Sequence, residues 1–118
     1  MPSGPGEFKH LFAIAVGPQP IEGYGAQPHV IMVSVTSIKP DYPYDPACVI
    51  KAGEHPFVTH DSYVYYRDPR IESVAHVQAM VDQAVWQSKE PCSPELLERI
   101  RAGLMSSTRV PRYIKKLL

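Results

Sequence analysis

The sequence predicts an α+β fold in which a small antiparallel sheet or barrel is backed by C-terminal helices. Short apolar and β-branched runs occupy the first half of the chain, and apolar residues at spacings of three and four follow from Ile71 onward. Strands that come first and helices that follow indicate α+β rather than alternating βαβ units. A length of 118 residues with 44% hydrophobic residues suits one domain with its own core.

The strand predictions rest on short apolar runs bounded by proline and glycine. Residues 10–16 (HLFAIAV) are closed by the Gly-Pro that follows, which is typical of a buried strand. Residues 29–37 (HVIMVSVTS) are rich in β-branched side chains and carry the strongest strand signal in the chain. Residues 48–53 predict a short strand that enters a turn. Residues 62–69 (SYVYYRDP) predict a strand ended by its own Asp-Pro, because proline has no N–H to donate.

The helix predictions rest on periodicity and capping residues. The first apolar face consists of Ile71, Val74, Val77, Met80, Val81, Ala84 and Val85. A second helix is predicted from Pro94, with Ser93 as its N-cap and Glu95 at the positive end of its dipole. Its inner stripe is Leu97, Ile100 and Leu104. Residues 111–118 predict a last short helical piece.

Composition excludes several classes of protein. The chain carries 12 basic and 12 acidic residues, so its net charge gives no argument for nucleic-acid binding. Cys48 and Cys92 lie far apart, which excludes a CxxC zinc or redox motif. No run approaches the ~18 apolar residues of a membrane helix, and no secretory leader is evident. We expect a cytoplasmic protein without membrane, metal or cofactor, with a flexible N-terminus at residues 1–8 and one domain at residues 9–118.

Two histidines, an acid and a hydroxyl are concentrated shortly before the last strand. His55 and His60 have a spacing without a strong metal meaning. Asp61 and Ser62 stand where a loop enters a strand, and such side chains bond nearby backbone groups. We favour this structural role over direct catalysis by the cluster. The two histidines stay candidates for an acid or a base near neutral pH.

The C-terminal segment is basic throughout. From residue 99 to the end there is no acidic residue, and the cations are Arg99, Arg101, Arg109, Arg112, Lys115 and Lys116. This asymmetry fits a phosphate-contacting face, and it fits equally a solvated surface with cations near a helix C-terminus. Tyr113 interleaves an aromatic ring with the last cations, which favours nucleic-acid contact slightly.

Hydroxyl and aromatic side chains form a second group of candidates. Thr36 and Ser37 end the strongest strand, where hydroxyls can face a groove, although ordinary strand and turn preferences also explain them. Tyr63 and Tyr65 share one face of their strand, because side chains alternate along a strand. One face of that strand is expected to pack in the core, and the other to stack a base or fill a subunit interface.

Three short motifs, taken in order, resemble the PemK/MazF toxin-like family. VSVTS at residues 33–37 matches that family's strand ending in Ile-Thr-Ser. DSYV at residues 61–64 matches its D-S-x-V segment, and Arg70-Ile71 matches the R-I that leads to its C-terminal helices. The resemblance covers residues 9–118.

The resemblance implies an SH3-like β-barrel with C-terminal helices, usually a homodimer. It also implies a metal-independent endoribonuclease that cleaves single-stranded RNA and is held inactive by an antitoxin protein. The threonine of the family's strand end matches Thr36, whereas the family's arginine has no counterpart here. The predicted catalytic residues are Thr36, Lys9, His10 and His60. The predicted nucleic-acid contacts are Ser37, His55, Arg112, Lys115 and Lys116.

The chemistry of such a site can be stated. Attack of an RNA 2′-hydroxyl needs a base, a donor to the phosphate and an acid for the leaving oxygen. Lys9 or His10, with Thr36, fit the phosphate donors, and His55 or His60 fit the acid or base. Without the arginine, the sequence also fits a non-catalytic SH3-like barrel that binds a protein partner.

Overall fold

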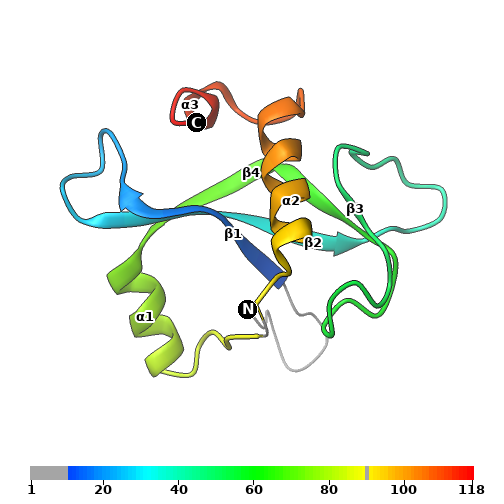
Figure 1. The fold of residues 1–118 in the computed structure, drawn as a ribbon, viewed down its shortest axis with the longest axis horizontal. Helices are drawn as coiled ribbons and strands as arrows, with labels where there is room; N and C mark the ends of the chain where they lie inside the picture. Colours follow the sequence, from blue (N-terminus) through cyan, green and yellow to red (C-terminus); the bar gives the residue numbers. More distant parts are fainter. Residues whose placement is uncertain (1–10, 90) are drawn as a thin grey trace.

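A computed structural model describes residues 11–89 and 91–118 (Figure 1). Its strands are β1 (Leu11–Pro20), β2 (Pro28–Ser37), β3 (Val49–Ile50) and β4 (Ser62–Ser73). Its helices are α1 (Val74–Asp82), α2 (Pro94–Ser106) and α3 (Arg112–Lys115). The expected flexible N-terminus at residues 1–8 and the candidates Lys9 and His10 lie outside the described residues. The α+β prediction, with strands before helices, is confirmed.

The strands form one antiparallel sheet in the order β1-β2-β4-β3. The sheet is curled into a half-barrel, and α2 crosses one of its faces (Figure 1). The core fills the space between that face and the C-terminal helices. Its buried members are Ala13, Ala15, Val33, Cys48, Ile50, Val58, Val64, Tyr66, Leu96, Ile100, Leu104, Val110 and Ile114.

Strand β1 continues past the Gly-Pro at which it was predicted to end. It extends to Pro20, with register shifts after Ile14 and after Val16. Gly17 makes this continuation feasible, because its φ of 93° lies in the region that favours glycine, and a Cβ there would meet the carbonyl oxygen of His29. The predicted end at residue 16 was therefore wrong.

Strand β4 likewise continues through its Asp-Pro to Ser73. In its pairing with β2, Tyr65 lies opposite Ser34 and Arg70 lies opposite Met32. An advance of five residues along β4 therefore corresponds to an advance of only two residues along β2, which marks an irregularity in the sheet. Pro69 lies inside this irregular stretch, where its missing N–H interrupts no regular ladder. The prediction that this proline ends the strand was wrong for that reason.

The helices begin at side-chain caps. Ser73 accepts a hydrogen bond from the N–H of His76 at 3.0 Å, so α1 starts at Val74, and Ile71 belongs to β4. Ala84 and Val85, which were predicted to continue the helical face, lie beyond the end of α1. Ser93 caps α2 through the N–H of Leu96 at 3.1 Å, as predicted.

The buried face of α2 differs by one residue from the predicted stripe. Ile100 and Leu104 are buried as expected. Leu96 is also buried in that face, in place of the predicted Leu97, which is only half-buried. The last helical piece is α3, which places Ile114 in the core. Among the described residues, no helix is long and apolar enough to cross a membrane.

Candidate functional site

A small pocket lies at the C-terminal end of β2. Its volume is about 200 Å³, and it is lined by Leu11, Val35, Thr36, Ser37, Lys39, Phe57, Val58, Thr59, His60 and Ser62. Three residues that the sequence singled out, Thr36, Ser37 and His60, meet here although they come from distant segments. The pocket therefore gathers hydroxyls, a cation and an imidazole, which are groups that contact phosphate oxygens.

Antiparallel pairing positions the hydroxyls of this pocket. Thr36 lies opposite Tyr63, and Ser37 lies opposite Ser62. Just beyond the strand, the N–H of Ile38 donates to the carbonyl oxygen of Asp61 at 2.9 Å. Thr36 and Ser37 are both exposed at the strand end, where they can reach a ligand.

His60 is exposed beside this strand end, and its neighbours hold the backbone around it. Ser62 donates to the carbonyl oxygen of His60 at 2.8 Å. The N–H of Ala52 donates to Asp61 at 3.0 Å, and this bond lowers the pKa of the Asp61 carboxyl below its ordinary value. Lys51 adds an ion pair to Asp61 at 3.4 Å. The predicted structural role of Asp61 and Ser62 is confirmed, although Ser62 bonds a carbonyl rather than an N–H.

Lys39 is a residue of this pocket that sequence reasoning missed. It is exposed and stands two residues after Ser37, where the chain leaves β2 for a Pro-rich loop. Pro40 follows it, and the Lys39 carbonyl accepts the N–H of Tyr42 at 3.4 Å, which starts a turn. The signal was available: Lys39 is the first cation after the strand that ends in Thr36 and Ser37.

His55 lies elsewhere, in a buried turn. It is 7% exposed, and its Nδ1 accepts the N–H of Phe57 at 3.0 Å, so the proton of a neutral ring sits on Nε2. It lines a second, larger cleft of about 490 Å³ instead of the small pocket. Four residues line both cavities: Leu11, Val35, Phe57 and Val58.

The larger cleft opens between the sheet and the connection from α1 to α2. Its wall is mainly apolar and includes Phe12, Ile14, Met32, Val77, Trp86 and Leu97. The α1 stripe faces this space, which explains why α1 has no fully buried residue. Arg70 lies between two aromatic rings of this region, 5.6 Å from the centroids of both Phe12 and Trp86.

The basic C-terminal segment divides into two groups of cations. The first group secures the fold: Arg99 pairs with Glu54, Arg101 donates to the carbonyl of Ala15, and Arg109 lies 3.9 Å from Asp45. The second group is exposed on α3 and directly after it, and consists of Arg112, Lys115 and Lys116. Lys115 also donates to the carbonyl of Met105 at 3.1 Å. Figure 1 shows α3 above the middle of β4, away from the end of β2 that carries the pocket.

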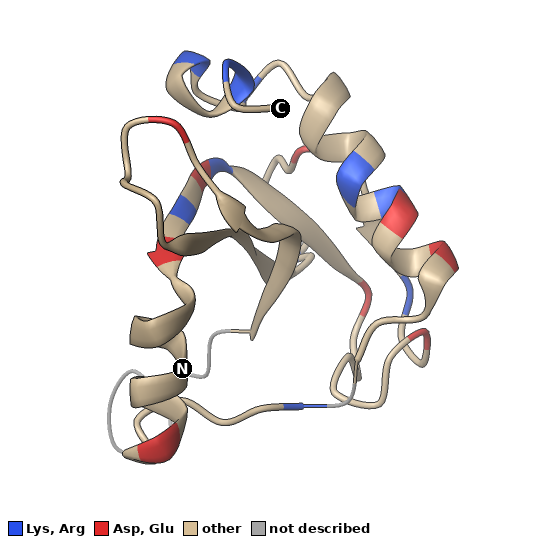
Figure 2. Ribbon diagram, turned by 60° about the vertical axis from the view of Figure 1, so that its left-hand side comes forward, with Lys and Arg blue, Asp and Glu red and all other residues tan. Residues whose placement is uncertain are grey.

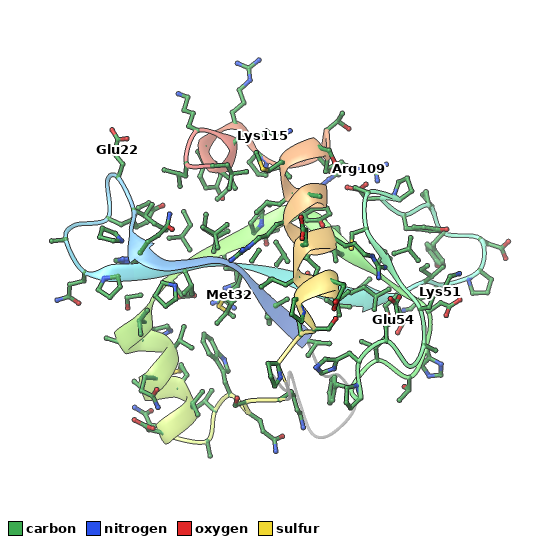
Figure 3. The ribbon with its side chains drawn as sticks, in the orientation of Figure 1. Glu22, Met32, Lys51, Glu54, Arg109 and Lys115 are labelled. Carbon is green, nitrogen blue, oxygen red and sulfur yellow. The ribbon has the colours of Figure 1, made fainter. Side chains whose placement is uncertain are left out.

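The Glu54–Arg99 pair ties the loop after β3 to α2. Figure 3 shows Glu54 and Lys51 together in this region. The Arg99 guanidinium contacts the Glu54 carboxylate at 2.5 Å and also donates to the carbonyl of Val49. Hydrogen bonding from Arg99 lowers the pKa of Glu54 below its ordinary 4.5. The loop that carries His60 is thus fastened at one end to a helix.

We expect this pair to make stability fall at acid pH. A carboxyl whose pKa is lowered by folding contributes stability above its unfolded pKa and loses that contribution as pH falls through its folded pKa. Both side chains are substantially exposed, so the contribution is under about 1 kcal/mol. Glu54→Gln should therefore shrink the loss of urea-unfolding free energy between about pH 5 and pH 3. Glu22→Gln, in the exposed β1–β2 turn, is the control; equal losses in wild type and Glu54→Gln contradict the assignment.

Two further features limit the chemistry of the described residues. Cys48 and Cys92 are free thiols, and burial raises the pKa of both, which makes them weak nucleophiles. Residues 11–89 and 91–118 contain no group of three or more histidine, cysteine or acidic side chains placed to hold a metal ion.

No family model, no curated protein and no solved structure matches this chain. Function must therefore be inferred from the site itself.

Proposed function

We propose that this chain is a PemK/MazF-like toxin-type protein with an SH3-like barrel, and that its small pocket cleaves single-stranded RNA without a metal ion. The observation that carries the proposal is the meeting of Thr36, Lys39 and His60 around one pocket of about 200 Å³. Lys39 supplies the cation for which the family uses an arginine. An antitoxin protein is the proposed partner, and a homodimer the proposed assembly.

The pocket residues can be assigned to the steps of RNA cleavage. The RNA 2′-oxygen loses its proton to a base and attacks the adjacent phosphorus, while the bond from phosphorus to the 5′-oxygen breaks and that oxygen takes up a proton. Lys39 and Thr36 donate to the non-bridging oxygens, where negative charge grows in the transition state. His60 exchanges one of the two protons. Lys9 and His10, which lie outside the described residues, stay the sequence-based candidates for a further donor to the phosphate. The products are a 2′,3′-cyclic phosphate and a 5′-hydroxyl.

Thr36→Ala is expected to slow cleavage of a long single-stranded RNA in EDTA by about tenfold, because one neutral hydrogen bond to phosphate is lost. Initial rates on denaturing gels measure the effect, and the product ends are checked for the 5′-hydroxyl. Thr108→Ala, an exposed threonine between α2 and α3, is the matched control and should keep the wild-type rate. No cleavage by the wild type rejects the nuclease proposal. Cleavage unchanged by Thr36→Ala rejects only the role of Thr36.

The larger cleft favours a second candidate function, a non-catalytic barrel that binds a protein partner. The cleft has a volume of about 490 Å³, and its mainly apolar wall suits apolar side chains of a bound protein segment. A comparison of two variants, Val77→Asp and Lys39→Ala, distinguishes the two functions. Val77→Asp places a charge in the wall of the cleft and should weaken partner binding while RNA cleavage continues. Lys39→Ala should do the reverse.

A further inference from the structure

The outward face of β4 carries a row of two aromatic rings and a cation. Tyr63, Tyr65 and Arg67 alternate with Val64 and Tyr66, both of which are 0% exposed in the core. Because side chains alternate along a strand, the first three residues point away from the core at intervals of about 7 Å. Tyr65 is 38% exposed and Arg67 is exposed, so this face is open to a ligand.

This row begins beside the small pocket. Thr36 of β2 is the cross-strand neighbour of Tyr63, and Ser34 is the neighbour of Tyr65. Directly opposed residues of an antiparallel pair place their side chains on the same face, so Thr36 and Tyr63 lie next to one another. Tyr44 packs against Tyr63 with ring centroids 5.4 Å apart, which supports the ring from the Pro-rich loop. Thr36, which lines the pocket, thus connects the pocket to the tyrosine row.

Positive charge lies at the far end of the row. Within the part of the chain that the structure describes, Arg67 forms no ion pair, so its guanidinium is available to an anion. Figure 2 shows basic and acidic positions alternating along the end of β4 that leads to α1. The predicted nucleic-acid contacts on α3 lie outside the pocket and on the other face of the sheet, because α3 packs Ile114 into the core.

We propose that Tyr63, Tyr65 and Arg67 form a track for the single-stranded RNA that extends from the pocket. Bases stack on the two tyrosines, and Arg67 holds a backbone phosphate. This inference rests on the proposed function, because it names how the substrate of the same pocket is bound. It also gives a reason for the preference for single strands, since the faces of bases reach such rings only when the strand is unpaired.

The test measures binding separately from cleavage. A fluorescein-labelled ten-nucleotide oligomer with 2′-deoxy sugars cannot be cleaved through a 2′-hydroxyl, and its Kd is measured by anisotropy in EDTA. Tyr65→Ala should raise the Kd about tenfold, as expected for loss of one stacked base. Tyr24→Ala, an equally exposed tyrosine in the β1–β2 turn, should stay within twofold. Arg67→Gln should lower the slope of log Kd against log salt by about one phosphate contact.

The outcomes separate this track from the proposed function. Tyrosine-dependent binding without RNA cleavage supports the track and rejects the nuclease. If RNA is cleaved but Tyr65→Ala has the same oligomer Kd as wild type, the track is rejected and the nuclease proposal is retained. Failure of the wild-type protein to bind the oligomer also overturns the track. So does a Tyr65→Ala protein that binds the oligomer normally but sediments as a smaller species than wild type. That second result would assign this face to contact between copies of the chain. Circular dichroism confirms that each variant is folded.

Discussion

Replacing Lys39 by alanine is expected to slow RNA cleavage by about 100-fold, the usual effect of removing one preorganised donor to a transition-state oxyanion. Lys39 is the cation of the pocket, so its loss removes charge stabilisation as well as a hydrogen bond. Single-turnover rates with saturating protein measure the chemical step directly. The pocket lies at the surface, and the fold should stay intact because Lys39 is exposed.

Two control variants make this result specific to the position. Lys39→Arg keeps a positive charge and should recover much of the rate, although the planar guanidinium has a different geometry. Lys116→Ala removes an exposed cation just after α3, away from the pocket. Because Lys116 is a predicted binding contact, its loss should raise the protein concentration needed for saturation, while the single-turnover rate at saturating protein stays within about twofold of wild type. Equal rates in wild type and Lys39→Ala contradict the assignment of the pocket as the reacting site.

Gly103→Ala is expected to destabilise the protein by about 2 kcal/mol. A Cβ at this position of α2 would meet the hydroxyl and ring of Tyr66, which is 0% exposed and cannot move aside. The Tyr66 hydroxyl donates to the carbonyl of Ile100 at 2.7 Å, and this bond fixes the ring against the helix. Overpacking of about 3 kcal/mol outweighs the gain of about 1 kcal/mol that alanine brings to a helix.

Urea unfolding measures this effect and its cause. The neighbouring Ala102→Ser is exposed and should change stability by less than about 0.5 kcal/mol. Tyr66→Phe removes the atom nearest to the added Cβ, so the double variant should lose less than the sum of the two single losses. A Gly103→Ala protein more stable than wild type would show that α2 does not approach β4 this closely.

Local patterns predicted much of the fold. The β-branched run before Thr36 became β2, and Ser93 with Pro94 marked the start of α2. Both signals are local, so they could be recognised without knowing the rest of the molecule. The ends of β1 and β4 were not predictable in this way. A positive φ at Gly17 and a register shift around Pro69 let both strands pass residues that usually stop a strand.

The candidate site was predicted in part. Thr36 and His60 were chosen by motif and residue type, and the fold brings them to one pocket. Lys39 was missed although it is the first cation after β2, because it becomes part of a site only when the loop of His60 folds back beside it. His55 has the same residue type as His60 but is buried in a turn, because residue type alone does not reveal which way a side chain points.

The most direct test of the pocket is cleavage of a long single-stranded RNA in EDTA by wild-type protein beside a Thr36→Ala/Lys39→Ala double variant. We predict fragments with 5′-hydroxyl ends from the wild type and at least a 100-fold slower reaction from the double variant. Intact RNA after long incubation with folded wild-type protein would contradict this prediction. So would equal cleavage by both proteins, which would place the activity outside this pocket.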